Sequence, residues 1–195
     1  MDRHELQHRM ADLPPNLLRH IDRVVQHARR LAHIHHADEE LAALAAQAHD
    51  IARHLPGREL LALATRFGLP IDTVDRSEPV LLHGPVGALL LPLRYGVAEP
   101  EAIVTTRYHT TGRTGMSLIE KVVFVADKVE PKKVQKRPEL AEVRELGERD
   151  LDAAMLRYLT LEQLRAAEKG WLLHPREVAT RNALLLAARR AEGRA

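Results

Sequence analysis

The chain of 195 residues contains no cysteine and few aromatic residues. Without cysteine it can form no disulfide and can bind neither zinc nor an iron–sulfur cluster through thiolates. Aromatic residues make up 3% of the sequence and hydrophobic residues 45%. A buried core must therefore consist mainly of leucine, alanine and valine. Leucine and alanine are strong helix formers, so this composition favours helices.

Long apolar runs and a strong charge of one sign are also missing. No stretch approaches the roughly 20 apolar residues that a membrane span requires. The N-terminal residues lack the apolar segment of a signal peptide. The 29 Lys and Arg residues nearly balance the 27 Asp and Glu residues, which gives a formal charge of +2. We expect a cytoplasmic protein that spans no membrane and has no stable nucleic-acid partner.

The sequence shows neither an alternation of strands and helices nor a glycine-rich phosphate-binding loop, which argues against a doubly wound nucleotide-binding sheet. Apolar residues instead recur at helical spacing from Leu17 to about His35. We expect an all-α fold, a single helical bundle over residues 1–195. Residues 1–15 would be helical or frayed, and helices from about 138 to 195 would pack on the core. Further helices are expected after Asp38 and over residues 58–67, 83–96, 99–108 and 117–129, with a loop over 69–79.

An imidazole and a carboxylate stand side by side at His49 and Asp50, within the alanine-rich run AALAAQAHDIARHL, which we expect to be helical. Burying such a pair costs several kcal/mol unless a partner satisfies it, and a divalent metal ion would do so. Four further residues of ligand type lie beside apolar residues elsewhere in the chain: His20, His83, His109 and Asp127. Histidine and carboxylate ligands suit iron, manganese or zinc.

Each of these residues also has a simpler interpretation when it is taken alone. His20 fits a half-buried histidine of a helix, His83 fits the first turn of a helix, and His109 fits a loop. Asp127, in the apolar run VVFVAD, needs either a metal or an arginine partner. The basic cluster after Pro131 indicates either a solvated loop or phosphate contacts. This cluster consists of Lys132, Lys133, Lys136 and Arg137.

The order H…HD…H…H…D resembles that of the HD-domain metal-dependent phosphohydrolases. The segments LRHIDRVVQHA, AHDIARHL, LLHGPVGALL, RYHTTGRTGMSLIEKVVFVADKVEP and KGWLLHP are similar to the YqeK family of symmetrical bis(5'-nucleosyl)-tetraphosphatases. The similarity runs from about residue 16 to residue 187. It implies an all-helical HD domain with two metal ions, usually described as iron. It also implies a hydrolase that cleaves diadenosine tetraphosphate, a dinucleoside polyphosphate, into two ADP.

The same resemblance implies the roles of the site residues. His20, His49, Asp50 and Asp127 would bind the first metal. His83 and His109 would bind the second, with Asp50 between the two. A metal-bridging hydroxide would attack phosphorus, with Asp50 as a catalytic residue. The spacing adds Arg53, which lies about one helical turn after Asp50 and has a guanidinium that suits phosphate, so we expect it to be catalytic as well. A surface salt bridge is the alternative for Arg53. Iron is expected, while manganese, cobalt and zinc are compatible with these ligands. The expected substrate contacts are Arg53, Thr110, Thr111, Gly112, Arg113, Lys128, Lys132 and Lys133.

Two other functions are compatible with the sequence. One is an HD-type nucleotidase or pyrophosphohydrolase that acts on another nucleotide. The other is a non-catalytic helical module that binds nucleotide or RNA. Six ligand-type residues argue against the second, because a binding module does not need them. His174, in the segment KGWLLHP, is expected to be structural or adjacent to the substrate.

Overall fold

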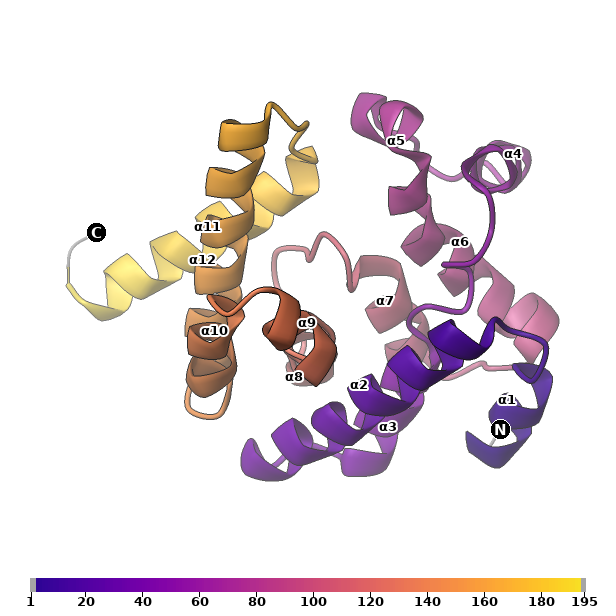
Figure 1. Ribbon diagram of the computed structural model, residues 1–195, viewed down its shortest axis with the longest axis horizontal. Coiled ribbons are helices and arrows are strands. Elements are labelled where there is room, and N and C mark those ends of the chain that lie inside the picture. Colours follow the sequence, from indigo (N-terminus) through magenta and orange to yellow (C-terminus); the bar gives the residue numbers. More distant parts are fainter. Residues whose placement is uncertain (1–2, 194–195) are drawn as a thin grey trace.

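The computed structural model describes residues 3–193, which form helices joined by short loops, with no strand among them (Figure 1). This confirms the predicted all-α fold. The expectations for residues 1–2 and 194–195 lie outside the described part. Within that part, no helix is both long and apolar enough to cross a lipid bilayer.

Helices α2 (Pro15–Ile34) and α3 (Glu39–Ala48) pack side by side and form one wall of the molecule (Figure 1). α2 begins at a proline, which suits the first turn of a helix because its missing N–H would have no partner there. The Asp38 side chain caps α3 by accepting from the backbone N–H groups of its first turn. Alanines line the buried side of α3, so neighbouring helices can approach it closely.

Helix α8 (Leu118–Lys128) lies at the centre of the core and contacts α2, α3, α7, α10 and α11. It begins with a capping box, in which Ser117 and Glu120 each bond to the other's backbone N–H. Nearly all of its residues are buried. A helix that is covered on nearly every side is apolar around most of its circumference, as the buried run Val122–Ala126 shows.

The remaining helices extend the bundle on both sides of α8. α10 and α11 pack on α8, and α12 packs on α11. α4, α5 and α6 lie on the opposite side of the molecule from α10–α12 (Figure 1). Their bounds are α1 Arg3–Arg9, α4 Gly57–Arg66, α5 Thr73–Ser77, η1 (3-10) Pro79–Leu82, α6 His83–Leu90, η2 (π) Leu91–Tyr95, α7 Pro100–Tyr108, α9 Pro131–Lys136, α10 Leu140–Gly147, α11 Leu151–Lys169 and α12 Pro175–Ala191.

The prediction that His49 and Asp50 lie inside a helix is wrong. α3 ends at Ala48, and the pair occupies the turns that follow. The backbone bonds there join residues three apart, Ile51 N to Ala48 O at 3.3 Å and Arg53 N to Asp50 O at 2.9 Å. These tighter turns direct the two neighbouring side chains toward one centre.

Two segments contain short helices that the sequence did not predict, namely residues 69–79, expected to be a loop, and the basic segment after Pro131, for which a solvated loop was one of two interpretations. Residues 69–79 include α5, which starts at a capping box between Asp72 and Asp75. The basic segment after Pro131 forms α9, and the Glu130 side chain caps it by accepting from Lys132 N at 3.2 Å. Local capping by acidic residues outweighed the loop-like composition in both places.

Candidate metal centre

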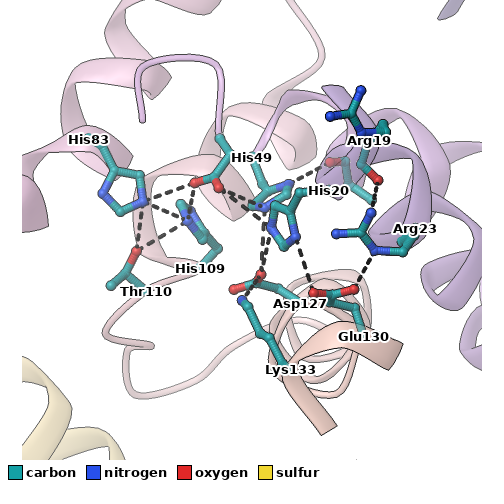
Figure 2. A network of polar contacts seen from close by, with 12 residues as sticks. Arg19, His20, Arg23, His49, His83, His109, Thr110, Asp127, Glu130 and Lys133 are labelled. Carbon is teal, nitrogen blue, oxygen red and sulfur yellow. Dashed lines mark hydrogen bonds and ion pairs between the residues drawn. The ribbon is translucent and has the colours of Figure 1, made fainter. Parts of the chain in front are cut away.

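The six ligand-type residues converge from five segments (Figure 2). His20 lies in the middle of α2, and His49 and Asp50 follow α3. His83 is the first residue of α6, His109 directly follows α7, and Asp127 is in the last turn of α8. These helices meet around α8, so residues that are far apart in the sequence share one centre.

Asp50 stands between two groups of ligands. Its Oδ2 is 3.6 Å from His20 Nε2 and 3.5 Å from His49 Nε2. Its Oδ1 is 3.1 Å from His83 Nε2 and 3.3 Å from His109 Nε2. Both sets of atoms are close enough to surround one ion each. A carboxylate that presents one oxygen to each group is suited to bridge two ions.

Asp127 lies beside the two histidines of the first group and forms ion pairs with two lysines. Its Oδ1 is 3.2 Å from His20 Nε2 and 3.8 Å from His49 Nε2. Lys128 Nζ donates to Oδ2 at 2.7 Å, and Lys133 Nζ donates to Oδ1 at 2.5 Å. The two ammonium groups balance the charge of this buried carboxylate, Lys128 at Oδ2 and Lys133 at Oδ1, the oxygen that also faces the histidines.

Three histidines are oriented in the same way. In each, Nδ1 is within hydrogen-bond distance of the carbonyl three residues earlier. The pairs are His49 with Ala46 (2.6 Å), His83 with Val80, and His109 with Thr106 (2.8 Å). A carbonyl can only accept, so each Nδ1 must donate and each Nε2 lone pair points into the centre. Metal-ligating histidines usually have such a carbonyl partner.

The inward lone pairs need a cation. His83 Nε2 and His109 Nε2 are 3.0 Å apart, and neither has a proton to donate if both Nδ1 atoms are protonated. The Thr110 hydroxyl lies within 3.2 Å of both but has one proton. His49 Nε2 is buried and has no hydrogen-bond partner within residues 3–193. These donors fit divalent metal ions.

The protonation states favour metal binding. Burial lowers the pKa of His49. Burial also lowers the pKa of His109 to about 4, although a hydrogen bond that Asp50 accepts from the ring would by itself raise it. Burial by itself would raise the pKa of Asp50, but His49, His109 and His83 outweigh it and hold that pKa well below its usual range. Lys128 and Lys133 likewise hold the pKa of Asp127 well below its usual range. Neutral imidazoles and ionised carboxylates are the forms that ligate metals.

A second layer of residues supports His20, and the sequence interpretation did not include it. His20 Nδ1 is 3.8 Å from Glu130 Oε1, and Arg23 Nε donates to Glu130 Oε2 at 2.5 Å (Figure 2). Glu130 is buried. Its position, three residues after Asp127 in the segment ADKVEP, was the available signal, because residues three apart share a face of a helical turn.

A cavity of about 190 Å³ opens onto the ligands, and it receives half of the expected substrate contacts. Arg53, Thr110, Lys128 and Lys133 line it. The structure does not bring the other four residues to this cavity, namely Thr111, Gly112, Arg113 and Lys132.

The side chain of Arg113 has another partner. It donates to both carboxylate oxygens of Glu120, with Nε to Oε1 at 2.8 Å and Nη2 to Oε2 at 2.6 Å. It also stacks on Tyr108, with 5.6 Å from Cζ to the ring centroid. Arg113 thus holds the loop after His109 to the start of α8. Lys132, another of the four residues that do not line the cavity, is exposed.

Helix α12 supports the loop that carries His109 and Thr110. Thr180 Oγ1 lies 3.2 Å from Thr111 O and 2.7 Å from Arg176 O. Gly112 in this loop has φ of +66°, and a Cβ there would lie 2.7 Å from Thr180 Cγ2. The C-terminal helices therefore take part in shaping the centre.

His174 has a structural role at the start of α12, in line with one of the two expectations for it. Its Nδ1 accepts from Arg176 N at 3.1 Å and caps the helix. Its Nε2 is 3.5 Å from Asp75 Oδ1, which connects α12 to α5. The contact joins the two sides of the molecule that Figure 1 shows apart.

The chain is similar to proteins of known family. The model of the HD domain matches residues 17–132. The symmetrical bis(5'-nucleosyl)-tetraphosphatase of Bacillus subtilis (strain 168) is 36% identical over 83% of this chain and 86% of that protein. The enzyme of the same name from Halalkalibacterium halodurans is 33% identical over 84% of this chain and 86% of that protein.

A crystal structure has the same fold. It is that of a predicted HD superfamily hydrolase involved in NAD metabolism from Clostridium acetobutylicum, with a TM-score of 0.87 and 31% identity over 94% of this chain and 96% of that one. The family model covers more than half of this chain, and the relatives match along most of their length. The chain therefore belongs to the HD domain family and, within it, to the family of the symmetrical bis(5'-nucleosyl)-tetraphosphatases.

Proposed function

We propose that this protein is a metal-dependent hydrolase that cleaves diadenosine tetraphosphate symmetrically into two ADP. The observation that carries the proposal is the position of Asp50, with one oxygen toward each pair of histidine Nε2 atoms. Such a centre is typical of two-metal phosphoryl hydrolysis. The names and the extent of similarity of the relatives support the substrate.

In this proposal the centre holds two ions. His20, His49, Asp50 and Asp127 would hold one, and Asp50, His83 and His109 would hold the other. Bound ions would lower the pKa of water and polarise phosphoryl oxygens. We propose iron, and manganese, cobalt and zinc suit the same ligands. The nitrogen and oxygen ligand set, without thiolate, supports a metal of this group.

The protein's own groups would bind and orient the polyphosphate. Arg53 lines the cavity and forms no ion pair within the described chain, so its planar guanidinium is free for phosphate oxygens. The Thr110 hydroxyl, beside His83 and His109, can donate to a phosphate oxygen. Lys128 and Lys133 add positive charge at the other side of the cavity. Fixed donors of this kind stabilise charge that develops in the transition state.

A cytoplasmic location belongs to the same proposal. A sequence without cysteine supports it, because disulfides are typical of oxidising compartments. Expression of the tagged protein followed by cell fractionation tests the location separately from the activity.

Product analysis tests the function. The metal-reconstituted protein is incubated with diadenosine tetraphosphate, and the nucleotides are separated by chromatography. We expect ADP alone. AMP together with ATP would mean asymmetric cleavage and would overturn the proposal. Turnover of another nucleotide, with this substrate left intact, would support the HD-type nucleotidase instead.

A further inference from the structure

A second cavity lies directly beside the metal centre. It has a volume of about 260 Å³ and is lined by Lys128, Lys133, Lys136, Arg137, Leu140 and Tyr158. Lys128 and Lys133 also line the cavity of the metal centre, so the two spaces share a wall. We call this second space the distal pocket. It lies among α8, α9, α10 and α11, and Figure 1 shows α9 beside α8 at this place.

Four cationic side chains line the distal pocket, and they differ in whether an acidic residue already pairs with them. Arg137 is fixed, because Nε donates to Glu139 Oε1 at 2.8 Å and Nη1 donates to Glu162 Oε1 at 2.5 Å. Lys136, in the last turn of α9, is exposed and forms no ion pair within residues 3–193. It is therefore available to an anionic ligand.

The other walls are suited to the uncharged part of a nucleotide. Leu140 is buried and supplies apolar surface. The Tyr158 ring stands edge-on to Phe124 at 5.7 Å between centroids. Lys128 Nζ lies 5.8 Å from the centroid of the Tyr158 ring. Ligand sites commonly combine apolar or aromatic walls with a few charged groups that orient the ligand.

The size of the substrate requires a second space. Pockets for drug-sized ligands have volumes of about 300–1,000 Å³, whereas the cavity at the metal centre has about 190 Å³. A dinucleoside tetraphosphate must extend beyond it. The larger hollow at α1, which includes His4, Met10 and Asp22, shares no lining residue with the metal centre. The distal pocket shares two, and both are lysines.

We propose that the distal pocket is the subsite for one of the two nucleoside diphosphate halves of the substrate, with Lys136 as a specificity-determining contact to its phosphates. This inference rests on the proposed function. The phosphate chain would run from the metal centre past Lys128 and Lys133 into the pocket. After symmetric cleavage, one ADP would lie at the metal centre and the other in the distal pocket.

The number of ADP molecules that the metal-loaded protein binds tests the subsite. We expect calorimetry to give two ADP per chain. Lys136→Glu should weaken one of the two sites by up to about fivefold, since one exposed ion pair contributes up to about that factor. The other site should keep its affinity. Arg149→Glu is the control, because it makes the same change of charge at an exposed residue that lines neither cavity.

The outcomes separate the subsite from the function. A protein that hydrolyses diadenosine tetraphosphate to ADP but binds one ADP per chain would overturn the subsite. So would equal effects of Lys136→Glu and Arg149→Glu on ADP binding. A protein that releases no ADP from this substrate would refute the proposed function itself, whatever the number of ADP molecules bound.

Discussion

Asp50 and Arg53 lie three residues apart and face the same cavity, but their proposed roles differ. Asp50 is buried and contacts both histidine pairs, whereas the side chain of Arg53 is exposed and forms no hydrogen bond or ion pair with the ligands within the described residues. The two residues therefore allow metal binding to be separated from phosphate binding by single substitutions.

We expect Asp50→Ala to lose both ions together with turnover, because each ligand group would lack its shared carboxylate. The loss of turnover should exceed the roughly 100-fold that removal of an outer-shell partner causes. Elemental analysis and steady-state kinetics measure the two effects. His54→Ala, at an exposed histidine four residues on, is the control. A folded Asp50→Ala protein with two ions per chain would contradict the role of Asp50.

Arg53→Ala should instead keep its metal and lose activity. Losing a hydrogen bond to a charged group costs about 1.5–3 kcal/mol, which corresponds to about tenfold or more in kcat/KM. The checks are kcat/KM and metal per chain on the same preparation. A parallel loss of metal would show that Arg53 supports the structure of the centre.

Glu177 on α12 gives a prediction about pH. Burial raises the pKa of Glu177 to about 7, with Glu162 adding to the effect and Lys128 opposing it. In the unfolded chain a glutamate loses its proton near pH 4.3. Between these values the folded state holds a proton that the unfolded state has lost. Stability therefore falls as the pH rises from about 4.5 to about 7.

Glu177→Gln removes the titrating group and with it this decrease in stability at higher pH. We expect the free energy of unfolding to rise by on the order of 1–3 kcal/mol at pH 8 and to stay unchanged at pH 4. Urea unfolding at both pH values measures it, with Glu168→Gln, at an exposed site on α11, as the control. An equal gain at both pH values would rule out titration of Glu177 as the cause.

At the scale of elements, the contact between α12 and the loop after His109 depends on a glycine. Gly112 and Gly68 have nearly the same backbone angle, with φ of +66° and +64°. A Cβ at Gly68 would meet nothing within 4 Å, whereas a Cβ at Gly112 would meet Thr180 Cγ2 at 2.7 Å. Substitution by alanine should therefore impose the same backbone strain at both positions, whereas only at Gly112 does the new side chain also clash with a neighbour.

We expect Gly68→Ala to lower the free energy of unfolding by about 1–2 kcal/mol, the cost of the left-handed conformation for an L-residue. Gly112→Ala should cost more, because the new methyl group displaces α12. In a Thr180→Ser background the methyl group at 2.7 Å is gone but the hydroxyl oxygen at 3.2 Å stays, so Gly112→Ala should cost less than in the wild-type background and approach the cost of Gly68→Ala. Thermal unfolding of the four variants checks this. Equal costs in the wild-type background would show that α12 does not pack tightly on the loop.

The elements also show how far local sequence determines structure. Periodicity predicted α2, and the helices expected after Asp38 and from residue 117 coincide with the starts of α3 and α8, where Asp38 and Ser117 are the capping residues. The end of α3 could not be predicted, because no helix-breaking residue occurs between Ala48 and Pro56, although the backbone changes to three-residue turns there. Propensity is a weak guide where a tertiary site determines the backbone.

At the scale of the whole molecule, the resemblance to a known family predicted which six residues come together, because each of them taken alone also fitted a simpler interpretation. The substrate contacts were less predictable, since they depend on which way exposed side chains turn. Arg113 illustrates this, because it lies in the expected loop but pairs with Glu120. The resemblance to a known family identified positions in the sequence, whereas partners across helices emerged only from the fold.

The centre joins α2, α8 and the segments after α3 and α7, so metal binding should stabilise the whole fold. A ligand that binds only the folded state stabilises it by about 2.7 kcal/mol per site at 100 times its Kd. For a chain of this size, a change of 1 kcal/mol in the free energy of unfolding shifts Tm by roughly 2–4 °C. Removing the metal with a chelator should thus lower Tm by roughly 5–11 °C per site lost, and adding Fe²⁺ or Mn²⁺ under anaerobic conditions should restore it. Asp50→Ala should show no shift in Tm on adding metal. A wild-type Tm that chelation leaves unchanged, in a protein shown to have lost its metal, would mean that the centre contributes nothing to folding.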